Sequence, residues 1–332
     1  MELPFEKLDR TILVKKEAIT NEKYGKKPEY RTTEELLNNG VLCLNKPEGP
    51  SSHNVADFVK KILKTEKVGH GGTLDPIVTG VLPISLGRAT KIMEALLKAG
   101  KEYVCLMHLH SNVSQSNIHK AFKEFIGKIT QLPPLKSAVK RQFREREIYY
   151  LEILEIKNQD VLFVVGCQAG TYIRTLCVQI GKMLGTNAHM QQLVRTKAGP
   201  FNDKEWYSLQ DIKDACTLYL EGNENEIKKV IKPVEFALQH LPKVWVIDSA
   251  VDSLCHGTNL SIPGIYKIEN CIKKDDLTAV FTLKNELICL GRSLMFSEDI
   301  MKNNKGSAVI ITRVFMDPEV YPHYKKFVER KP

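Results

Sequence analysis

Hydrophobic positions change their spacing along this chain, and each spacing predicts a different kind of element. The continuously apolar run at 41–44 (VLCL) is typical of a buried strand. The segment after it has the spacing of an amphipathic helix, with Ser51 or Ser52 placed to cap its first turn. The apolar positions of this helix are Val55, Phe58, Val59, Ile62 and Leu63.

The same spacings predict further strands and helices as far as residue 185. We expect strands at 80–86 and 101–110, helices at 89–100, 118–127 and 171–185, and a hairpin over 149–170 that turns at Asn158 to Asp160. Gly100 and Gly127 are expected to stop the first two of these helices.

The chain therefore divides into four parts. We expect residues 1–40 to form an extended polar arm that packs on the C-terminal domain, and residues 41–235 to form a domain of mixed α and β structure. Residues 242–318 predict a small β-rich domain, and 319–332 a basic tail. The fold class is α+β, with a mixed, largely antiparallel sheet, flanking helices and a small C-terminal β-barrel.

The charge of the chain favours a polyanionic partner. The formal net charge is +9 over 332 residues. Residues 58–101 contain eight Lys or Arg against three Asp or Glu, and 136–146 contain five against one. Such runs are most often solvated faces, but two of them beside an acidic loop favour a track for a nucleic-acid backbone.

Cysteines and histidines indicate no metal or disulfide framework. The eight cysteines never form a Cys-x-x-Cys pair, and the histidines are scattered without the spacing of zinc ligands. No apolar run approaches the roughly 18 residues that span a membrane, and the first segment lacks the apolar core of a signal peptide. We expect a reducing, intracellular location, either cytoplasmic or, in a eukaryote, nucleolar. Trp206 and Trp245 are expected in the core or at a domain interface.

The loop GHGGTLDP at 69–76 has three competing interpretations. It fits neither phosphate-binding pattern, G-x-x-x-x-G-K-[ST] or G-x-G-x-x-G. A plain tight turn is the commonest meaning of such a glycine-rich segment. The third interpretation is a loop that presents Asp75. The glycines tolerate positive φ and allow another backbone to approach, while Pro76 keeps Asp75 out of the α region.

Arg174 is the second informative residue. It falls in the first turn of the helix predicted at 171–185. A helix N-terminus and a guanidinium together favour an anion, either a phosphate or a carboxylate such as Asp75. On the residues alone, an ordinary surface arginine remains the alternative.

Six segments occur in the order found in TruB-like pseudouridine synthases, and the chain resembles that family over residues 41 to 201. The segments are KPEGPSSH, GHGGTLDPIVTGVLP, GKEYV, PPLKSAVK, AGTYIRTL and LVRTKAGPF. The C-terminal stretch resembles a PUA domain, an RNA-binding module. The match is closer to the archaeal and eukaryotic, dyskerin-like branch, whose members are catalytic subunits of box H/ACA guide-RNA particles.

The resemblance implies an enzyme that breaks the C1′–N1 bond of a uridine in RNA, rotates the base and rejoins it through C5, without cofactor or metal. Asp75 falls on the essential carboxylate of the family and Arg174 on its basic partner. Tyr103 falls on the aromatic residue that stacks on the target base. Whether Asp75 attacks the sugar or the base, or removes the C2′ proton, is left open.

The resemblance also implies RNA contacts. Leu193 matches an apolar residue that lines the uridine pocket, and His70 matches a histidine that holds the flipped nucleotide. Lys46 and Pro47 match a motif of the family that has a structural role, and Lys46 is expected near the floor of the active site. Lys140 and Arg141, in the second basic stretch, are candidate contacts with RNA.

The implied partners are H/ACA guide RNA, rRNA, tRNA and the small proteins of the particle, with no membrane. The bacterial tRNA enzymes have longer segments at two places that help to hold the tRNA. Here the connection at 111–116 is short, and PPLKSAVK runs directly into the next strand. The shorter segments favour selection of the target uridine by a guide RNA. The alternatives are a stand-alone tRNA pseudouridine synthase, a non-catalytic RNA-binding scaffold and a base-excising glycosylase. Intact Asp75, Tyr103 and Arg174 argue against the scaffold, and the other matched segments argue against the glycosylase.

Overall fold

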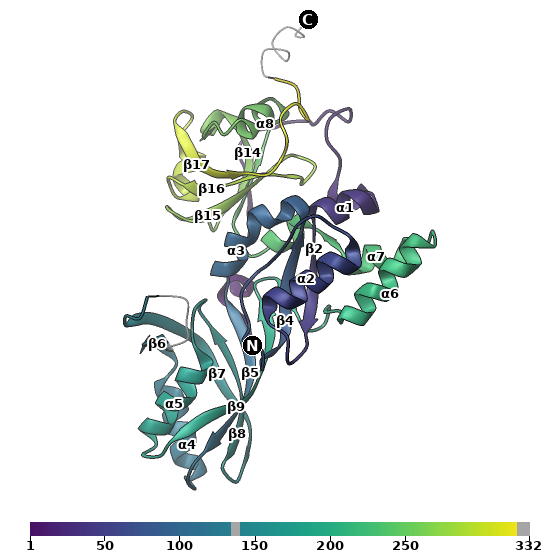
Figure 1. The fold of residues 1–332 in the computed structure, drawn as a ribbon. Helices are drawn as coiled ribbons and strands as arrows, with labels where there is room; N and C mark the ends of the chain where they lie inside the picture. Colours follow the sequence, from purple (N-terminus) through teal and green to yellow (C-terminus); the bar gives the residue numbers. More distant parts are fainter. Residues whose placement is uncertain (134–139, 324–332) are drawn as a thin grey trace, which may run out of the picture.

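The computed structural model describes residues 1–133 and 140–323, and two β-sheets organise them (Figure 1). Within these ranges the larger sheet has ten strands. Eight follow the order β11-β2-β4-β9-β5-β8-β7-β6, while β10 pairs with β9 and β3 with β4. The strands are β2 (Gly40–Lys46), β3 (Val68–His70), β4 (Thr79–Leu86), β5 (Lys101–Leu109), β6 (Gly127–Gln131), β7 (Arg144–Lys157), β8 (Asp160–Cys167), β9 (Ala188–Ala198), β10 (Phe201–Asn202) and β11 (Lys232–Pro233).

The half of this sheet built on β2 and β4 is covered by helices α2 (Ser52–Leu63), α6 (Leu209–Leu220) and α7 (Asn225–Val230). The Ser51 side chain caps α2 by accepting a hydrogen bond from the backbone N–H of Asn54, which confirms the predicted start of this helix. Three of the five predicted apolar positions are buried in the core between α2 and the sheet, whereas Phe58 is exposed.

The helix predicted at 89–100 is shorter than expected. A 3₁₀ helix, η3 (Gly87–Ile92), leads into α3 (Met93–Lys98), and the chain is extended at Ala99. Gly100 is not the residue that stops it. The ammonium of Lys101 lies at the end of α3 and donates three hydrogen bonds there, which satisfies carbonyl groups that a glycine cap would otherwise serve. The acceptors are the carbonyl oxygens of Leu96, Leu97 and Ala99.

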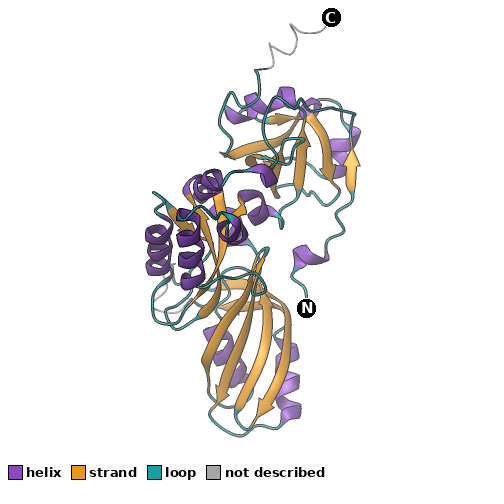
Figure 2. Cartoon of the chain, turned by 90° about the vertical axis from the view of Figure 1, so that its right-hand side faces the viewer, coloured by secondary structure: helices purple, strands orange, loops and turns teal. Residues whose placement is uncertain are grey.

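The other half of the sheet is antiparallel, with helices α4 (Gln115–Glu124) and α5 (Ile173–Met183) packed on the shared core (Figure 2). The predicted hairpin is confirmed, because β7 pairs with β8 as far as Lys157 and Asp160. Asn158 occupies the turn with a φ of 55°, a conformation that asparagine tolerates better than most residues.

The two halves meet where β4 lies beside β9. Their parallel pairing involves Thr79 with Val194 and Gly80 with Arg195. Gly80 has a φ of +104°, and a Cβ placed there would lie 2.3 Å from the carbonyl oxygen of Arg195. Only glycine therefore allows the two strands this approach. The junction matters for function because the candidate residues come from both sides of it.

The smaller sheet forms the C-terminal domain, with strand order β1-β14-β12-β15-β16-β17-β13. Its strands are β1 (Ile12–Val14), β12 (Lys243–Val246), β13 (Leu260–Ser261), β14 (Ile265–Glu269), β15 (Leu277–Phe281), β16 (Leu287–Ser293) and β17 (Ser307–Val314). Helices α8 (Asp248–Cys255) and α9 (Ser297–Lys302) and the short 3₁₀ helix η5 (Ile262–Gly264) belong to this part of the chain, and η4 (Val234–Leu238) leads into it. Trp245 is buried in a hydrophobic cluster to which both domains contribute, and the partly buried Trp206 packs against that cluster. The predicted core or interface positions of the two tryptophans are confirmed.

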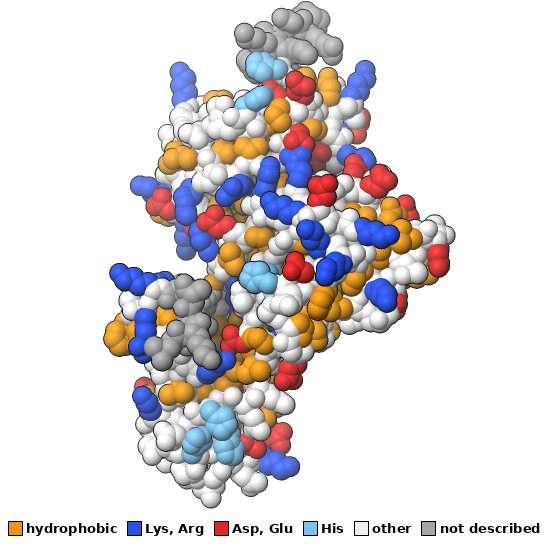
Figure 3. Space-filling view, viewed as in Figure 1, with side chains coloured by type: hydrophobic (Ala, Val, Ile, Leu, Met, Phe, Trp, Pro, Cys, Tyr) orange, Lys and Arg blue, Asp and Glu red, His pale blue; other side chains and the backbone are white. Residues whose placement is uncertain are grey.

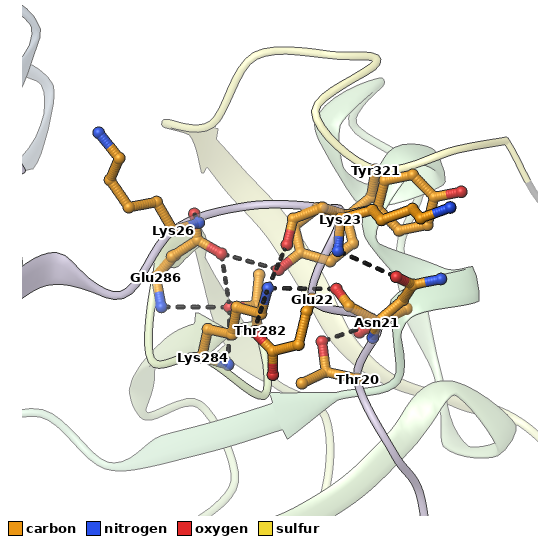
Figure 4. Close-up of polar contacts among 11 residues, drawn as sticks. Thr20, Asn21, Glu22, Lys23, Lys26, Thr282, Lys284, Glu286 and Tyr321 are labelled. Carbon is orange, nitrogen blue, oxygen red and sulfur yellow. Dashed lines mark hydrogen bonds and ion pairs between the residues drawn. The ribbon is translucent and has the colours of Figure 1, made fainter. Parts of the chain in front are cut away.

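The N-terminal arm joins the two domains. It comprises η1 (Pro4–Lys7), β1, η2 (Pro28–Tyr30) and α1 (Thr33–Asn39), and β1 pairs antiparallel with β14. Its middle part is held by Lys284, whose ammonium donates to the carbonyl of Asn21 (Figure 4). The same ammonium donates to the carbonyl of Tyr24. The buried Glu286 carboxylate accepts from the Lys26 backbone and from the hydroxyl of Tyr321. Tyr321 lies within the segment predicted as a tail, and it is buried.

The predicted α+β fold class is confirmed by this arrangement of two sheets with flanking helices. In the part of the chain that the structure describes, no helix is long and apolar enough to cross a membrane. All eight cysteines are free.

Candidate active site

The loop between β3 and β4 holds Asp75 by contacts on both sides of it. Before Asp75, the Ser52 hydroxyl accepts from the backbone N–H of Leu74 at 2.8 Å and donates to its carbonyl at 3.1 Å. After it, the N–H of Val78 donates to the carbonyl of Asp75 at 3.0 Å. The Leu74 side chain is buried in the core, so the loop is anchored and Asp75 is turned outward.

Gly72 has the positive φ that was predicted for the glycines of this loop. Its φ is +130°, which a residue with a side chain rarely adopts. A Cβ at this position would lie 3.5 Å from Nη1 of Arg195. The glycine therefore lets the backbone bend close to a buried guanidinium.

Lys46 lies under the same loop and is fully buried, at 0% exposure. Its ammonium donates to the carbonyl oxygens of Pro47 at 2.8 Å, Pro76 at 3.0 Å and Val78 at 3.0 Å. Burial lowers the pKa of Lys46, and the nearby charge of Asp75 opposes that shift. These three acceptors occupy all three N–H groups, so the geometry supports a role in holding the loop more than a direct contact with RNA.

Asp75 and Arg174, which we call the exposed pair, form the contact expected from the sequence. Arg174 Nη2 donates to Asp75 Oδ2 at 2.5 Å. Arg174 stands in the first turn of α5. Both side chains are about half exposed, at 56% for Asp75 and 50% for Arg174. An ion pair in contact with solvent adds little to folding stability, but it restricts the orientation of the carboxylate.

Tyr103 and Arg195 face each other across neighbouring strands. They are paired residues of β5 and β9, and the Arg195 guanidinium donates to the carbonyl oxygens of Val81 at 2.7 Å and Gly72 at 3.0 Å. Burial raises the pKa of Tyr103, and the charge of Arg195 opposes the rise. Tyr103 also packs on the apolar core that includes Leu74 and Leu193. Lys46 and Arg195 together are called the buried framework below.

Leu193 and His70 lie on strands next to these residues. Leu193 is buried in β9, two positions before Arg195 and therefore on the same face of the strand. His70 ends β3, and its ring packs edge-on against His53 with centroids 4.8 Å apart. Burial, then the charges of His53 and Arg195, lower the pKa of His70 and favour its neutral form.

His70 also borders a groove of about 560 Å³ that reaches the C-terminal domain. Lys67, Lys91 and Arg313 line it and outnumber the acidic Asp57 and Glu94. Figure 3 shows that Lys and Arg side chains gather on the face around α2 and α3 and along the adjoining edge of the C-terminal domain. This surface has the charge that an RNA backbone requires.

Lys140 and Arg141 are exposed, and both precede β7. The rest of the PPLKSAVK segment from 134 to 139 lies outside the described residues. An RNA contact at these two positions stays a prediction.

Sequence reasoning missed Arg195 and the grouping of three histidines. The signal for Arg195 was its position two residues after Leu193, because alternate residues of a strand share a face. His108, His110 and His189 have no metal-ligand spacing in the sequence, yet they lie together at one end of β5 and β9, where His110 Nε2 is 2.9 Å from His189 Nδ1. Among the described residues, no group of three or more His, Cys, Asp or Glu is arranged to hold a metal ion.

Four family models match the chain in succession. They are described as the DKCLD (NUC011) domain over residues 1–56, the N-terminal domain of TruB family pseudouridylate synthase over 60–173, the C-terminal domain of tRNA pseudouridylate synthase B over 174–239 and the PUA domain over 242–315. A protein of Methanopyrus kandleri named probable tRNA pseudouridine synthase B is 50% identical over 321 residues, which cover 96% of this chain and 95% of that protein. The chain belongs to the TruB family of pseudouridine synthases.

A second relative and two solved structures are similar to this chain over nearly its whole length. A protein of Archaeoglobus fulgidus with the same name is 51% identical over 93% of this chain and 95% of its own length. A chain in the crystal structure of a Cbf5-Nop10-Gar1 complex matches with a TM-score of 0.93 at 50% identity, covering 97% of this chain and 98% of that one. A chain in an H/ACA RNP bound to a substrate RNA containing 2′-deoxyuridine matches with a TM-score of 0.91 at 47% identity, covering 98% and 100%. The predicted family and its dyskerin-like branch are thereby confirmed.

Proposed function

We propose that this TruB family enzyme converts uridine to pseudouridine at the site formed by Asp75, Tyr103 and Arg174, and that a guide RNA selects most of its targets. The observation that supports the site most directly is the 2.5 Å contact between Asp75 and Arg174, which lie 99 residues apart in the sequence. Two distant segments meet there on either side of the junction between β4 and β9.

The reaction exchanges one bond to the sugar for another. The C1′–N1 bond breaks, a C1′–C5 bond forms, C5 loses a proton and N1 ends with one. Asp75 acts on the sugar or the base, or removes the C2′ proton, and Arg174 keeps it oriented through their hydrogen bond. Tyr103 stacks on the target base, Leu193 lines its pocket and His70 holds the flipped nucleotide. These roles need no group beyond the side chains named.

The RNA partners follow from the surface and from the similar proteins. Two similar chains are parts of complexes whose names include H/ACA RNP, substrate RNA, Nop10 and Gar1. We propose that this chain likewise binds a guide RNA and small proteins of that kind. The proposed division is an arm (1–40), a catalytic domain (41–235), a PUA domain (242–318) and a tail (319–332). The PUA domain and the basic groove would hold the RNA.

A second candidate is direct action on tRNA. It is favoured by the names of the archaeal relatives, which describe tRNA pseudouridine synthases. It requires the same Asp75 chemistry, and it differs only in what selects the uridine.

Release of tritium from RNA labelled at C5 of uridine tests both candidates, because C5 loses its hydrogen in the reaction. We expect slow release from an rRNA fragment with the protein alone, and fast release at one site when a matching H/ACA guide RNA and the small partner proteins are added. Efficient release from a tRNA transcript that a guide does not improve would establish the tRNA enzyme instead. No release from any RNA, with intact binding, would leave an RNA-binding scaffold.

A further inference from the structure

Gln131 is a buried polar residue that holds the start of helix α5. It is the last residue of β6, and its exposure is 2%. Its amide forms two hydrogen bonds with the backbone of Tyr172, which lies 41 residues later in the chain. The N–H of Tyr172 donates to Oε1 of Gln131 at 2.9 Å, and Nε2 of Gln131 donates to the carbonyl of Tyr172 at 3.2 Å. One side chain thus binds one backbone residue in both directions.

The place of these bonds is the first residue of the helix. Tyr172 is the N-cap of α5, and its own side chain makes no capping hydrogen bond. The backbone N–H of an N-cap residue has no partner within the helix, so Gln131 supplies one. The carbonyl of Tyr172 also accepts the first bond within the helix, from the N–H of Leu176 at 3.0 Å. Gln131 therefore restrains both the position and the rotation of the first turn.

Arg174 depends on the position of that turn. It follows Tyr172 by two residues, which is about 3 Å along a helix axis. Its side chain is half exposed, and among the described residues Asp75 is its one hydrogen-bond partner. A long side chain in contact with solvent has other rotamers open to it. The backbone beneath Arg174 therefore decides whether the 2.5 Å contact with Asp75 is kept.

Each member of the exposed pair is thus held through a buried polar side chain. Ser52 binds both the N–H and the carbonyl of Leu74, the residue before Asp75. Gln131 does the same at the start of α5. The two anchors belong to different halves of the larger sheet, so each places one partner of the pair.

We propose that Gln131 is a positioning residue for the reaction: by holding the first turn of α5, it sets the guanidinium of Arg174 against the carboxylate of Asp75. This inference deepens the proposed function and rests on the roles given there to Asp75 and Arg174. The two hydrogen bonds also stabilise the fold, so a test has to separate positioning from stability.

A double-mutant cycle with Arg174 makes this separation. Gln131→Met keeps the length of the side chain and removes both hydrogen bonds, and we expect kcat to fall about 10-fold with RNA affinity within about 3-fold. In an Arg174→Ala protein, the same change should lower kcat by less than about 2-fold, because the side chain that Gln131 positions is already gone. Equal losses in both backgrounds would mean that Gln131 is merely structural, and they would overturn the inference.

The matched control is Gln179→Met. Gln179 lies on α5 and belongs to the same network: its Oε1 accepts from Nε2 of Gln131 at 3.2 Å, and its Nε2 donates to the carbonyl of Thr130 at 2.8 Å. Neither bond involves the backbone at the start of the helix. We expect a lower melting temperature and a kcat within about 2-fold. A loss of kcat equal to that of Gln131→Met would contradict a specific role of Gln131.

Gln131→Glu repeats the cycle with a smaller change, for the case in which methionine prevents folding. Its carboxylate still accepts from the N–H of Tyr172 but cannot donate to the carbonyl. We expect kcat to fall about 3-fold when Arg174 is present and to stay constant in Arg174→Ala. Equal losses would again overturn the inference.

A spectroscopic readout separates this inference from the proposed function. With arginine labelled by ¹⁵N, the Nε resonance lost in Arg174→Ala identifies Arg174. In protein without RNA, that resonance should move in Gln131→Met and stay in place in Gln179→Met, because only the first change releases the start of α5. An unmoved resonance in Gln131→Met would refute the inference. Absence of tritium release by the unaltered protein would instead refute the proposed function and leave the hold of Gln131 on the ion pair standing.

Discussion

Two arginines serve the same site, and they differ in nearly every physical respect. Arg174 is half exposed, stands at the start of a helix and pairs with the carboxylate of Asp75. Arg195 is buried in a central strand and donates to two backbone carbonyls. The exposed pair can exchange its contacts with water or with a substrate at little cost, whereas the buried framework cannot.

The difference shows that the site combines an exposed carboxylate with a loop that buried side chains hold in place. The exposed pair adds little to stability, and under the proposed function its part is to orient the carboxylate. The buried framework holds the loop through carbonyl oxygens at Gly72, Pro76 and Val78, which leaves Asp75 with few ways to move. A loop so restrained presents one carboxylate in one orientation, which is what a reaction on a single nucleotide needs.

The largest expected effect is the loss of activity in Asp75→Asn. The change keeps the volume of the side chain and removes its charge, so tritium release should fall by at least about 10³-fold. The melting temperature should stay nearly constant because the exposed pair contributes at most about 1 kcal/mol. Glu226→Gln is the matched control: Glu226 also forms an exposed ion pair, with Lys229, and its loss should leave activity unchanged. Activity retained in Asp75→Asn would end the mechanism.

Lys46→Met should have the next largest effect, which is a loss of folding stability. Methionine fills the space of the stem but leaves three buried carbonyl groups without their donor, which should lower the free energy of unfolding by about 3 kcal/mol. Urea unfolding followed by circular dichroism measures this. A stability equal to that of the unaltered protein would mean that the framework does not depend on Lys46, and the contrast with the exposed pair would fail.

Arg174→Ala should lower kcat about 10²-fold while RNA affinity stays within about 3-fold, since the carboxylate loses its orienting charge but the basic surface remains. Single-turnover rates and filter binding measure the two quantities separately. Lys182→Ala, at an exposed position in the last turn of the same helix, is the control and should change neither. A large loss of affinity with unchanged chemistry would make Arg174 a phosphate contact instead.

The smallest effect concerns His240, which precedes the C-terminal domain and packs edge-on against Phe5 of the N-terminal arm. Its Nε2 donates to the carbonyl of Ala95 at 3.1 Å, while Nδ1 is buried without a hydrogen-bond partner. Burial lowers the pKa of His240 to about 4, below the unfolded value of about 6.5. The unfolded chain therefore takes up the proton first as pH falls, and stability present above pH 6.5 is lost on the way down to pH 4.

Between pH 7 and pH 5 this group should cost about 2 kcal/mol of unfolding free energy. His240→Gln cannot titrate and can still donate to Ala95, so its stability should depend less on pH over that interval. His256→Gln, at an exposed histidine, should retain the dependence of the unaltered protein. Identical acid sensitivity in all three proteins would show that another group is responsible.

Much of the fold was predictable because local periodicity is strong in this chain. Helix α2, the hairpin around Asn158 and the first turn of α5 follow from spacing and turn residues alone. The glycine-rich loop and the start of α5 made Asp75 and Arg174 candidates, and the family resemblance then implied that Asp75 is the essential carboxylate and Arg174 its partner. Such features are contained within a few consecutive residues.

What escaped prediction depends on contacts between distant segments. Arg195 looks like any strand arginine until β9 is known to lie between β4 and β5. The sequence predicts that α3 ends at Gly100, because a glycine cap can be recognised from neighbouring residues alone. In the structure, the last carbonyl groups of α3 accept hydrogen bonds from the ammonium of Lys101 instead. The histidines meet only because β5 and β9 are paired.

The pairing of β1 with β14 has a consequence for the order of events during synthesis. Ile12 pairs with Glu269, so the ribosome must add about 250 residues after the arm before its partner strand exists. At typical elongation rates that interval is on the order of tens of seconds, far longer than the microseconds in which helices and hairpins form. The strands that hold Asp75, Tyr103 and Arg195 are complete at Ala198, well before β14 is made. The earliest residues of the chain are thus among the last to find their place, and they close the molecule after its reactive centre has been assembled.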